Sequence, residues 1–331
     1  MSWEFYLEPF TLNIAFAMLL GNWGQVAVAA YIVMSSYYFC DTTKVKLSKV
    51  IILVFETQMM CFTAGIIYTV GFAEVTIKTL VRVILTAMVS PFSGHYWFIQ
   101  GYIIFYLSIP LLNIALRDIK RMNHQRLMIV FGILLFICDF FQIRAFGTLV
   151  DFAFIFSITC YIKRYYGAGN RRKSVILTVG CFLSIFAACI ILNIFGKYQP
   201  DIAFMIPRIF VHWNPLIVCC AISLFWSVKD RKRSGSKIIY TIAPTAFGIY
   251  LLHENIYFGG RDSLLWIKIL HLDDAVTNPY FVFQLLVSGL IVFLICMVVA
   301  FAVRVIINSV CNIKPVHRGL TKVDDWYGGY L

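Results

Sequence analysis

The sequence predicts an all-α, polytopic transmembrane helix bundle. Of its 331 residues, 61% are hydrophobic and only 13% are charged, which is too little charge to cover a soluble domain of this size. The apolar residues also come in runs close to the twenty that span a bilayer core, such as VILTVGCFLSIFAACIILNIF. These runs lack the alternation of barrel strands, so helices that satisfy their own backbone groups are expected.

The apolar runs predict nine membrane spans within one membrane-embedded domain over 1–331. No linker, internal repeat or low-complexity segment divides the chain. The predicted spans are 24–40, 50–71, 96–116, 127–143, 148–162, 174–195, 211–228, 238–257 and 280–307.

Two further apolar segments are expected at the membrane interface. Residues 10–20 are too short to cross alone, and GNWGQ separates them from the next run, so 1–23 is expected on the outer side or at the interface. Residues 75–90 are expected to lie similarly, because Lys78 and Arg82 form one polar stripe on an apolar helix.

The basic residues predict the orientation. With the N-terminus outside, the segments 41–49, 117–126, 163–173 and 229–237, together with Arg304 and a cytoplasmic tail over 308–331, hold 21 of the 28 basic residues. Cytoplasmic loops carry this excess in multi-pass proteins of the cell membrane. The net charge of +12 is therefore interpreted as a topology signal and a contact with anionic membrane lipids, and no nucleic-acid partner is expected.

The start of the chain does not fit this orientation easily. MSWEFYLEPF has no basic region typical of a signal peptide and carries two Glu residues. Nine spans with an outer N-terminus are the topology expected of a ten-span protein that lacks its first helix.

Common cofactor and metal motifs are not found in the sequence. It has no Walker loop, dinucleotide fingerprint or zinc spacing. The ten cysteines lie in the predicted spans or near their inner ends, without a Cys-x-x-Cys pair, which favours a role as small packing residues. No metal or resident cofactor is expected.

Candidate chemistry lies near the outer ends of two spans. His95 opens the span 96–116, and His253 with Glu254 lies near the outer end of 238–257. Imidazoles titrate near neutrality, so two of them with a carboxylate at one level make a plausible acid–base cluster. Alternatively, His95 with Tyr96 and Trp97 belongs to an interfacial aromatic belt, and His253 snorkels or caps its helix.

The remaining ionisable residues have competing interpretations. Asp151 starts one span, whereas Asp139 and Arg144 could neutralise each other. Glu56 could pair with Lys49 or another inner cation, or line a pocket for a donor's head group. The loop DTTKVKLSK is either a plain positive-inside loop or a site where lysines meet phosphate as point charges.

Four segments, in order, resemble the acyltransferase-3 family of membrane acyltransferases, in particular its exopolysaccharide-modifying branch. SGHYWFIQGYIIFYLSIPLLN is similar to the family's His-x-Trp-Phe segment, and IAPTAFGIYLLHENIY to its Gly-Ile-Tyr-Leu-Ile-His signature. GQVAVAAYIVMSSYYF and LIVCCAISLFWSVKD resemble its second and eighth helices. The resemblance covers most of 20–310.

The resemblance implies ten helices and transfer of an acyl group, commonly acetyl, from cytoplasmic acyl-CoA to a hydroxyl of a cell-surface polysaccharide or its lipid-linked precursor. His95 and His253 match histidines of the family motifs, and together with Glu254 of the acid–base cluster they are the predicted catalytic residues. The expected donor-binding residues are Lys46 and Lys49, where the family has an Arg-x-x-Arg pair, and Glu56. The expected acceptor-binding residues are Trp97, Tyr102, Asp151, Ser35 and Ser36, of which Ser36 replaces a family glycine.

One departure from the family is large. The family's Arg and His, about ten residues apart on its first helix, have no counterpart here, because no Arg or Lys precedes Lys44 and no His precedes His95. Either the true start lies upstream or this is a degraded relative, and His95 and His253 would then orient donor or acceptor. A catalytically inactive binding subunit and a transporter of polysaccharide or lipid-linked sugar remain as alternatives, although no inverted repeat is seen.

Overall fold

The computed structural model describes residues 11–141, 147–167, 170–199, 211–229, 236–259, 264–272 and 274–328. Within these ranges the chain forms helices and short connections, with no strand, as the all-α prediction requires. Among these residues, five segments are long and apolar enough to cross a membrane: Leu12–Phe39, Leu47–Phe72, Ile77–Arg117, Arg171–Tyr198 and Phe281–Cys311. The prediction of a multi-pass helical membrane protein is thereby confirmed.

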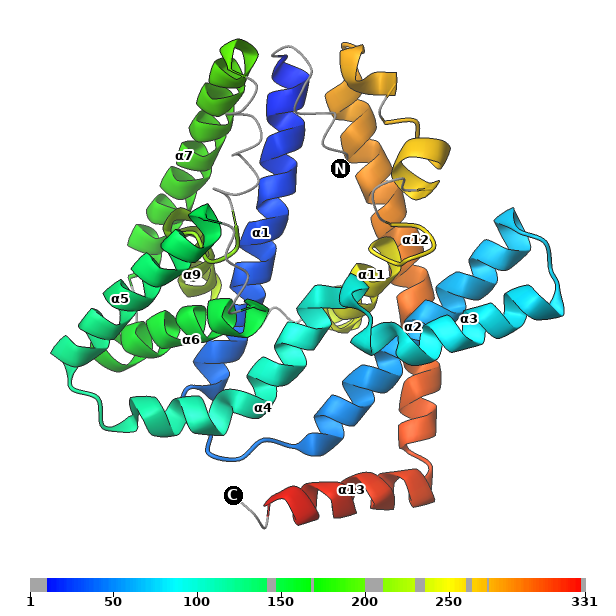
Figure 1. Cartoon of the computed structure of the whole chain (residues 1–331), viewed down its shortest axis with the longest axis horizontal. Helices are drawn as coiled ribbons and strands as arrows, with labels where there is room; N and C mark the ends of the chain where they lie inside the picture. Colours follow the sequence, from blue (N-terminus) through cyan, green and yellow to red (C-terminus); the bar gives the residue numbers. More distant parts are fainter. Residues whose placement is uncertain are drawn as a thin grey trace. The chain divides into compact units, whose positions relative to one another are not determined.

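The helices gather into two compact units, which we describe separately (Figure 1). The first unit comprises 46–103 and 234–331, and the second comprises 3–45 and 104–233. Helix α4 (Trp97–Arg117) begins in the first unit and continues into the second. The prediction of one domain over 1–331 stays a prediction.

The second unit is built around its first helix. Helix α1 (Leu12–Phe39) packs against α6 (Gly147–Tyr166), α7 (Arg171–Tyr198) and α9 (Pro215–Val228). Helix α7 also packs on α9, and α5 (Arg121–Phe140) packs on α6.

Helix α1 corrects one expectation from the sequence. It runs unbroken through GNWGQ, so 10–20 does not form a separate interfacial helix; residues 1–10 lie outside the described part. Each glycine within a helix costs about 1 kcal/mol relative to alanine, which favoured a break. Tertiary contacts offset this cost, because Asn22 donates a hydrogen bond to the Cys189 sulfur at 3.1 Å and Trp23 packs edge-on against Phe182.

The first unit is organised around α2 (Leu47–Phe72). This helix packs against α3 (Ile77–Val89), α11 (Ala246–His253), α12 (Phe281–Cys311) and α13 (Lys314–Gly328). Helix α11 also lies along α12. Short elements complete the unit: the 3-10 turns η2 (Ser90–Phe92), η3 (Gly94–Tyr96), η4 (Ala243–Thr245) and η6 (Asp274–Thr277), the π-helix η5 (Leu264–Ile269) and helix α10 (Lys237–Ile242).

The segment 75–90 is a helix, as predicted. Thr76 caps α3, with a reciprocal contact from Thr79, and Val83 and Ala87 are buried whereas Lys78 and Arg82 are exposed. Gly65 allows the close approach of α3 to α2, because a Cβ there would lie 2.7 Å from a Val83 methyl group. The location of α3 at the membrane interface stays a prediction.

The predicted span 238–257 is not one continuous helix. Helix α10 ends at Ile242, the 3-10 turn η4 contains Pro244, and α11 ends at His253. Proline lacks a backbone N–H and disfavours helical geometry in the residue before it, which accounts for the break. Gly248 seats α11 against its neighbours, since a Cβ there would lie 2.6 Å from the Met60 side chain and 2.7 Å from the Ala300 Cβ.

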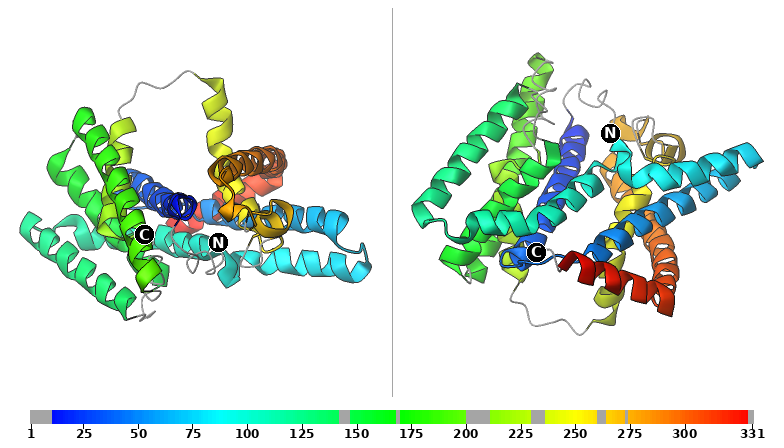
Figure 2. Two further views of the ribbon diagram at one scale, coloured as in Figure 1. Left: turned by 90° about the horizontal axis from the view of Figure 1, so that it is seen from above. Right: turned by 60° about the horizontal axis from the view of Figure 1, so that its bottom comes forward.

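The tail after α12 is not extended. Residues 314–328 form helix α13, which lies across the end of α12 and near the start of α2 (Figures 1 and 2). Its contact with α2 includes two hydrogen bonds, in which the backbone N–H and the hydroxyl of Ser48 donate to the Asp324 carboxylate at 2.8 and 2.6 Å.

Candidate functional site

The two signature histidines lie in the same unit, on segments that meet. His95 sits in the turn η3, directly before α4, and His253 is the last residue of α11. The His95 Nε2 atom makes a short hydrogen bond with the backbone oxygen of Glu254. The structure therefore brings His95, His253 and Glu254 together although more than 150 positions separate them in the chain.

The hydrogen bonds assign the proton positions on these imidazoles. A carbonyl oxygen only accepts, so His95 Nε2 carries a hydrogen and the Nδ1 of the neutral ring is left as a base. His253 Nδ1 likewise donates to the Ile249 oxygen at 2.8 Å, which leaves Nε2 with its lone pair.

The second imidazole faces a carboxylate. His253 Nε2 lies 3.6 Å from Glu254 Oε1, a distance too long for a hydrogen bond but suited to an ion pair when the ring is protonated. Both side chains are partly exposed, at 31% and 55%, so solvent weakens the attraction.

A buried polar network fixes the two segments to each other. The Tyr96 hydroxyl donates to the Leu251 oxygen at 3.0 Å and accepts from Asn255 Nδ2 at 2.7 Å. Asn255 Oδ1 accepts from the Tyr257 N–H at 3.1 Å. Because Tyr96 and Asn255 are almost fully buried, these bonds define the register of the two histidine segments.

This network includes residues that sequence reasoning missed. Tyr96 was expected in an aromatic belt, but it is 1% exposed, so that interpretation is wrong; Trp97 is 38% exposed, as a belt residue would be. Asn255 was not singled out, although an amide two residues after the signature His253 is a signal of a polar partner. Gln100, one helical turn after Tyr96, was also missed, and its Nε2 is buried without a hydrogen-bond partner.

The aromatic side chains near the histidines pack against one another. Phe98 lies between Tyr102 and Tyr250, with ring centroids at 5.9 and 5.7 Å. Tyr102 therefore stacks on Phe98, which contacts Tyr250 of α11 edge-on, and Trp97 also contacts Phe98 edge-on.

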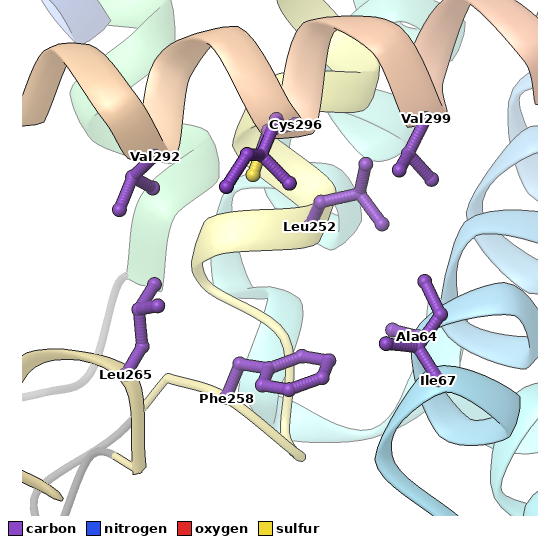
Figure 3. Close-up of a pocket in the computed structure, with 9 residues that line it drawn as sticks. Ala64, Ile67, Leu252, Phe258, Leu265, Val292, Cys296 and Val299 are labelled. Atoms are coloured by element: carbon purple, nitrogen blue, oxygen red, sulfur yellow. The ribbon is translucent and has the colours of Figure 1, made fainter. Parts of the chain in front are cut away.

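An apolar cavity adjoins the same segments (Figure 3). It has a volume of about 150 Å³, and its lining includes Leu252 and Phe258, which flank His253 and Glu254 in the chain, and Ala64 and Cys296 from α2 and α12. A cavity lined by these apolar side chains suits a small apolar group.

The predicted donor-binding residues lie at the other end of α2. Lys46 is the N-cap of α2, Lys49 lies in its first turn, and both are exposed. Glu56 lies two turns further on, and its carboxylate is 3.9 Å from Arg304, which also bonds the Pro244 oxygen. Of the cations expected to pair with Glu56, the structure therefore places Arg304 beside it and not Lys49.

Three predicted residues lie in the second unit. Ser36 is fully buried with an unpartnered hydroxyl, and Ser35 is also buried. Asp151 Oδ2 is 3.2 Å from His212 Nε2, close enough for an ion pair but not aligned as a hydrogen bond. His212 escaped sequence reasoning because no pattern links it to Asp151. Arg144 and the Asp139 side chain lie outside the described residues.

Comparison of the sequence with known protein families, curated proteins and solved structures identifies its family. Residues 2–307 match the family model of the acyltransferase-3 acyltransferase domain. No curated protein shows significant similarity to the chain. No solved structure does either. With nearly the whole sequence matched, this helical membrane protein belongs to the acyltransferase-3 family.

Proposed function

We propose that the protein transfers an acyl group, most simply acetyl, from acyl-CoA to a hydroxyl of a cell-surface polysaccharide or its lipid-linked precursor. The observation that carries this proposal is the meeting of His95, His253 and Glu254 on segments clamped by Tyr96 and Asn255. Family membership supports membrane acyl transfer in general. The polysaccharide acceptor and the acyl-CoA donor belong to the proposal.

The arrangement supports a balanced proton transfer. The acceptor hydroxyl loses its proton to His95 Nδ1, its oxygen bonds to the thioester carbon, and the carbon–sulfur bond breaks. The departing thiolate then takes this proton from His95 Nδ1, so that the imidazole returns to its neutral state, and His253 beside Glu254 stabilises the charge that develops in this step. His95 is oriented for this step by the Glu254 backbone oxygen, which holds Nε2 as the protonated nitrogen.

The acyl group has a place beside these residues. The apolar cavity next to Leu252 and Phe258 suits a short hydrocarbon chain, because each buried methylene gains about 0.8 kcal/mol. In this proposal Trp97 and Tyr102 contact the acceptor.

The donor's phosphates are proposed to bind at the start of α2. Lys46 and Lys49 flank backbone N–H groups at a helix N-terminus, which favours anions. The same helix end accommodates the Asp324 carboxylate on Ser48, which supports its affinity for anionic oxygens. Glu56 is paired with Arg304, so we assign it a supporting role near the donor.

The proposed location is the cell membrane, with the N-terminus outside and the C-terminus in the cytosol. The cytosolic segments would then hold 21 of the 28 basic residues. The α2 start with Lys46 would face cytosolic acyl-CoA, and the imidazoles would lie toward the outer side.

The test is acyl transfer in proteoliposomes. The purified chain receives radiolabelled acetyl-CoA and a crude lipid-linked polysaccharide fraction, and labelled product is counted. His95→Ala and His253→Ala should each lower transfer by roughly 10²-fold or more while the protein still inserts. His317→Ala, which removes an imidazole from α13, serves as the control.

Two outcomes would contradict this assignment. Wild-type turnover in both variants would return His95 and His253 to a structural role. No transfer by the unaltered chain, together with retention of the polysaccharide fraction, would favour the non-catalytic binding subunit.

A further inference from the structure

The start of helix α2 receives no cap from its own N-cap residue. Lys46 holds that position, and its side chain makes no capping hydrogen bond; lysine is not among the residues that cap helices well. The first backbone N–H groups of a helix lack partners within the helix and carry partial positive charge. An anionic acceptor from elsewhere in the chain, or from a ligand, can therefore bind at this end.

The C-terminal helix α13 supplies such an acceptor. The Asp324 carboxylate accepts hydrogen bonds from the Ser48 backbone N–H at 2.8 Å and from the Ser48 hydroxyl at 2.6 Å. Both bonds are charge-assisted, and they are made at a largely buried serine. Lys46 and Lys49 lie on either side of Ser48 in the chain. A carboxylate of the protein thus occupies the position that the proposal above gives to a phosphate of the donor.

The rest of α13 is held loosely. None of residues 314–327 is buried. An apolar groove of about 410 Å³ lies between this helix, α2 and the end of α12, with Val316 and Leu320 in its lining. A segment with few buried contacts opens at a low cost in free energy. The two bonds from Ser48 are therefore important for keeping α13 in place.

Helix α13 lies outside the catalytic arrangement. The matched acyltransferase domain ends at residue 307, seven positions before α13 begins at Lys314. No residue of α13 takes part in the transfer step proposed above. Its Asp324 carboxylate and a phosphate of acyl-CoA would nevertheless need the same two donors, and Ser48 cannot give both donors to two anions at once.

We propose that α13 (314–328) is an autoinhibitory latch on the donor site. Asp324 occupies the Ser48 donors when acyl-CoA is absent, and a phosphate of acyl-CoA displaces it, because the phosphates of the donor carry more negative charge than one carboxylate. The closed latch raises the donor concentration that fills the site, since only the open fraction binds. This inference rests on the donor site proposed above.

The test measures binding of radiolabelled coenzyme A to the full chain in detergent, by equilibrium dialysis. Asp324→Asn keeps the shape of the side chain and removes its charge. It should lower the apparent dissociation constant about tenfold, the factor by which one charge-assisted hydrogen bond typically shifts an equilibrium. Asp325→Asn is the matched control, because it removes the same charge from an exposed neighbour on α13 and should leave the constant unchanged.

Hydrogen exchange follows the latch itself. Coenzyme A added to the unaltered chain should raise exchange at 314–328 about tenfold, because the ligand takes the place of Asp324 and frees the helix. In Asp324→Asn, exchange should be high before coenzyme A is added and should rise no further. Asp325→Asn should behave like the unaltered chain in both states.

Three results would overturn the latch. An unchanged dissociation constant in Asp324→Asn would show that the carboxylate only caps α2. Unchanged exchange on adding coenzyme A would show that the ligand binds without displacing Asp324. Absence of coenzyme A binding by both chains would remove the donor site and the latch together. If Asp324→Asn fails to fold, the exchange experiment on the unaltered chain decides alone.

Failure of the proposed function gives a different pattern. A chain that binds coenzyme A more tightly after Asp324→Asn, yet transfers no acetyl group in proteoliposomes, would keep the latch and lose the reaction. Acetyl transfer with the same dissociation constant in both chains would keep the reaction and lose the latch.

Discussion

The buried hydroxyl of Tyr96 offers a sharp test of how the histidine segments are held together. Tyr96→Phe keeps the ring and creates no cavity, so the change removes only polar contacts. The lost contacts are the bonds to Leu251 at 3.0 Å and from Asn255 at 2.7 Å. Asn255 Nδ2 would then keep only the Leu251 oxygen at 3.4 Å, at the weak limit of a hydrogen bond.

Two limits bracket the loss in the free energy of unfolding that Tyr96→Phe should cause. Interhelical hydrogen bonds in membrane proteins are worth about 0.6 kcal/mol on average, so the two bonds give a lower limit near ~1 kcal/mol. Leaving a buried donor unsatisfied costs about 1 to 3 kcal/mol. We therefore expect a loss of about 2 kcal/mol in the free energy of unfolding, roughly a thirtyfold change in the equilibrium.

The assay is reversible unfolding by sodium dodecyl sulfate in mixed micelles, followed by far-ultraviolet circular dichroism. Tyr68→Phe serves as the control, because that half-buried ring stacks on Tyr257 at 5.4 Å and lies outside the network. Asn255→Leu and the double variant complete a thermodynamic cycle, with an expected coupling above about 1 kcal/mol. A Tyr96→Phe effect no larger than that of Tyr68→Phe would refute the argument.

Three further predictions concern other parts of the two units. Gly248→Leu should destabilise the protein by about 1 to 3 kcal/mol through overpacking against Met60 and Ala300, measured by the same unfolding assay, and a neutral effect would contradict the close approach. His124, before the predicted span 127–143, is fully buried, and burial lowers its pKa. The unfolded chain therefore binds its proton more readily, so stability should fall as pH drops from about 7.5 to 5, by at most ~1.4 kcal/mol per pH unit, and His124→Gln should flatten this slope in thermal scans. Asp324→Ala should release α13 by removing both bonds from Ser48, raising hydrogen exchange at 314–328 about tenfold or more, and unchanged exchange would show that the contact is unimportant.

The membrane class of this chain was readable from composition, because lipid accepts long apolar helices and little else. Helix boundaries were less predictable. The glycines at GNWGQ suggested a break that the contacts of Asn22 and Trp23 prevent, whereas Pro244 divided a span that hydropathy alone made continuous. The helix propensity of a single residue is worth only about 1 kcal/mol, so tertiary contacts of similar energy can outweigh it.

The candidate site was readable only in part. His95, His253 and Glu254 stood out because ionisable groups are rare in such a chain. Tyr96 and Asn255 did not, since a tyrosine near a helix mouth is typical of the interface and a single asparagine has no periodicity. Their role depends on a contact across 159 positions.

The sequence by itself determined that this is an apolar, multi-pass helical protein with its two signature histidines near helix ends, because hydropathy and residue type are properties of each segment alone. Only the tertiary structure decided which nitrogen of each imidazole carries its hydrogen, which partner Glu56 takes, and that the tail folds back on Ser48. These outcomes depend on hydrogen bonds between segments distant in the chain, and the direction of such bonds is fixed by geometry that no local pattern contains.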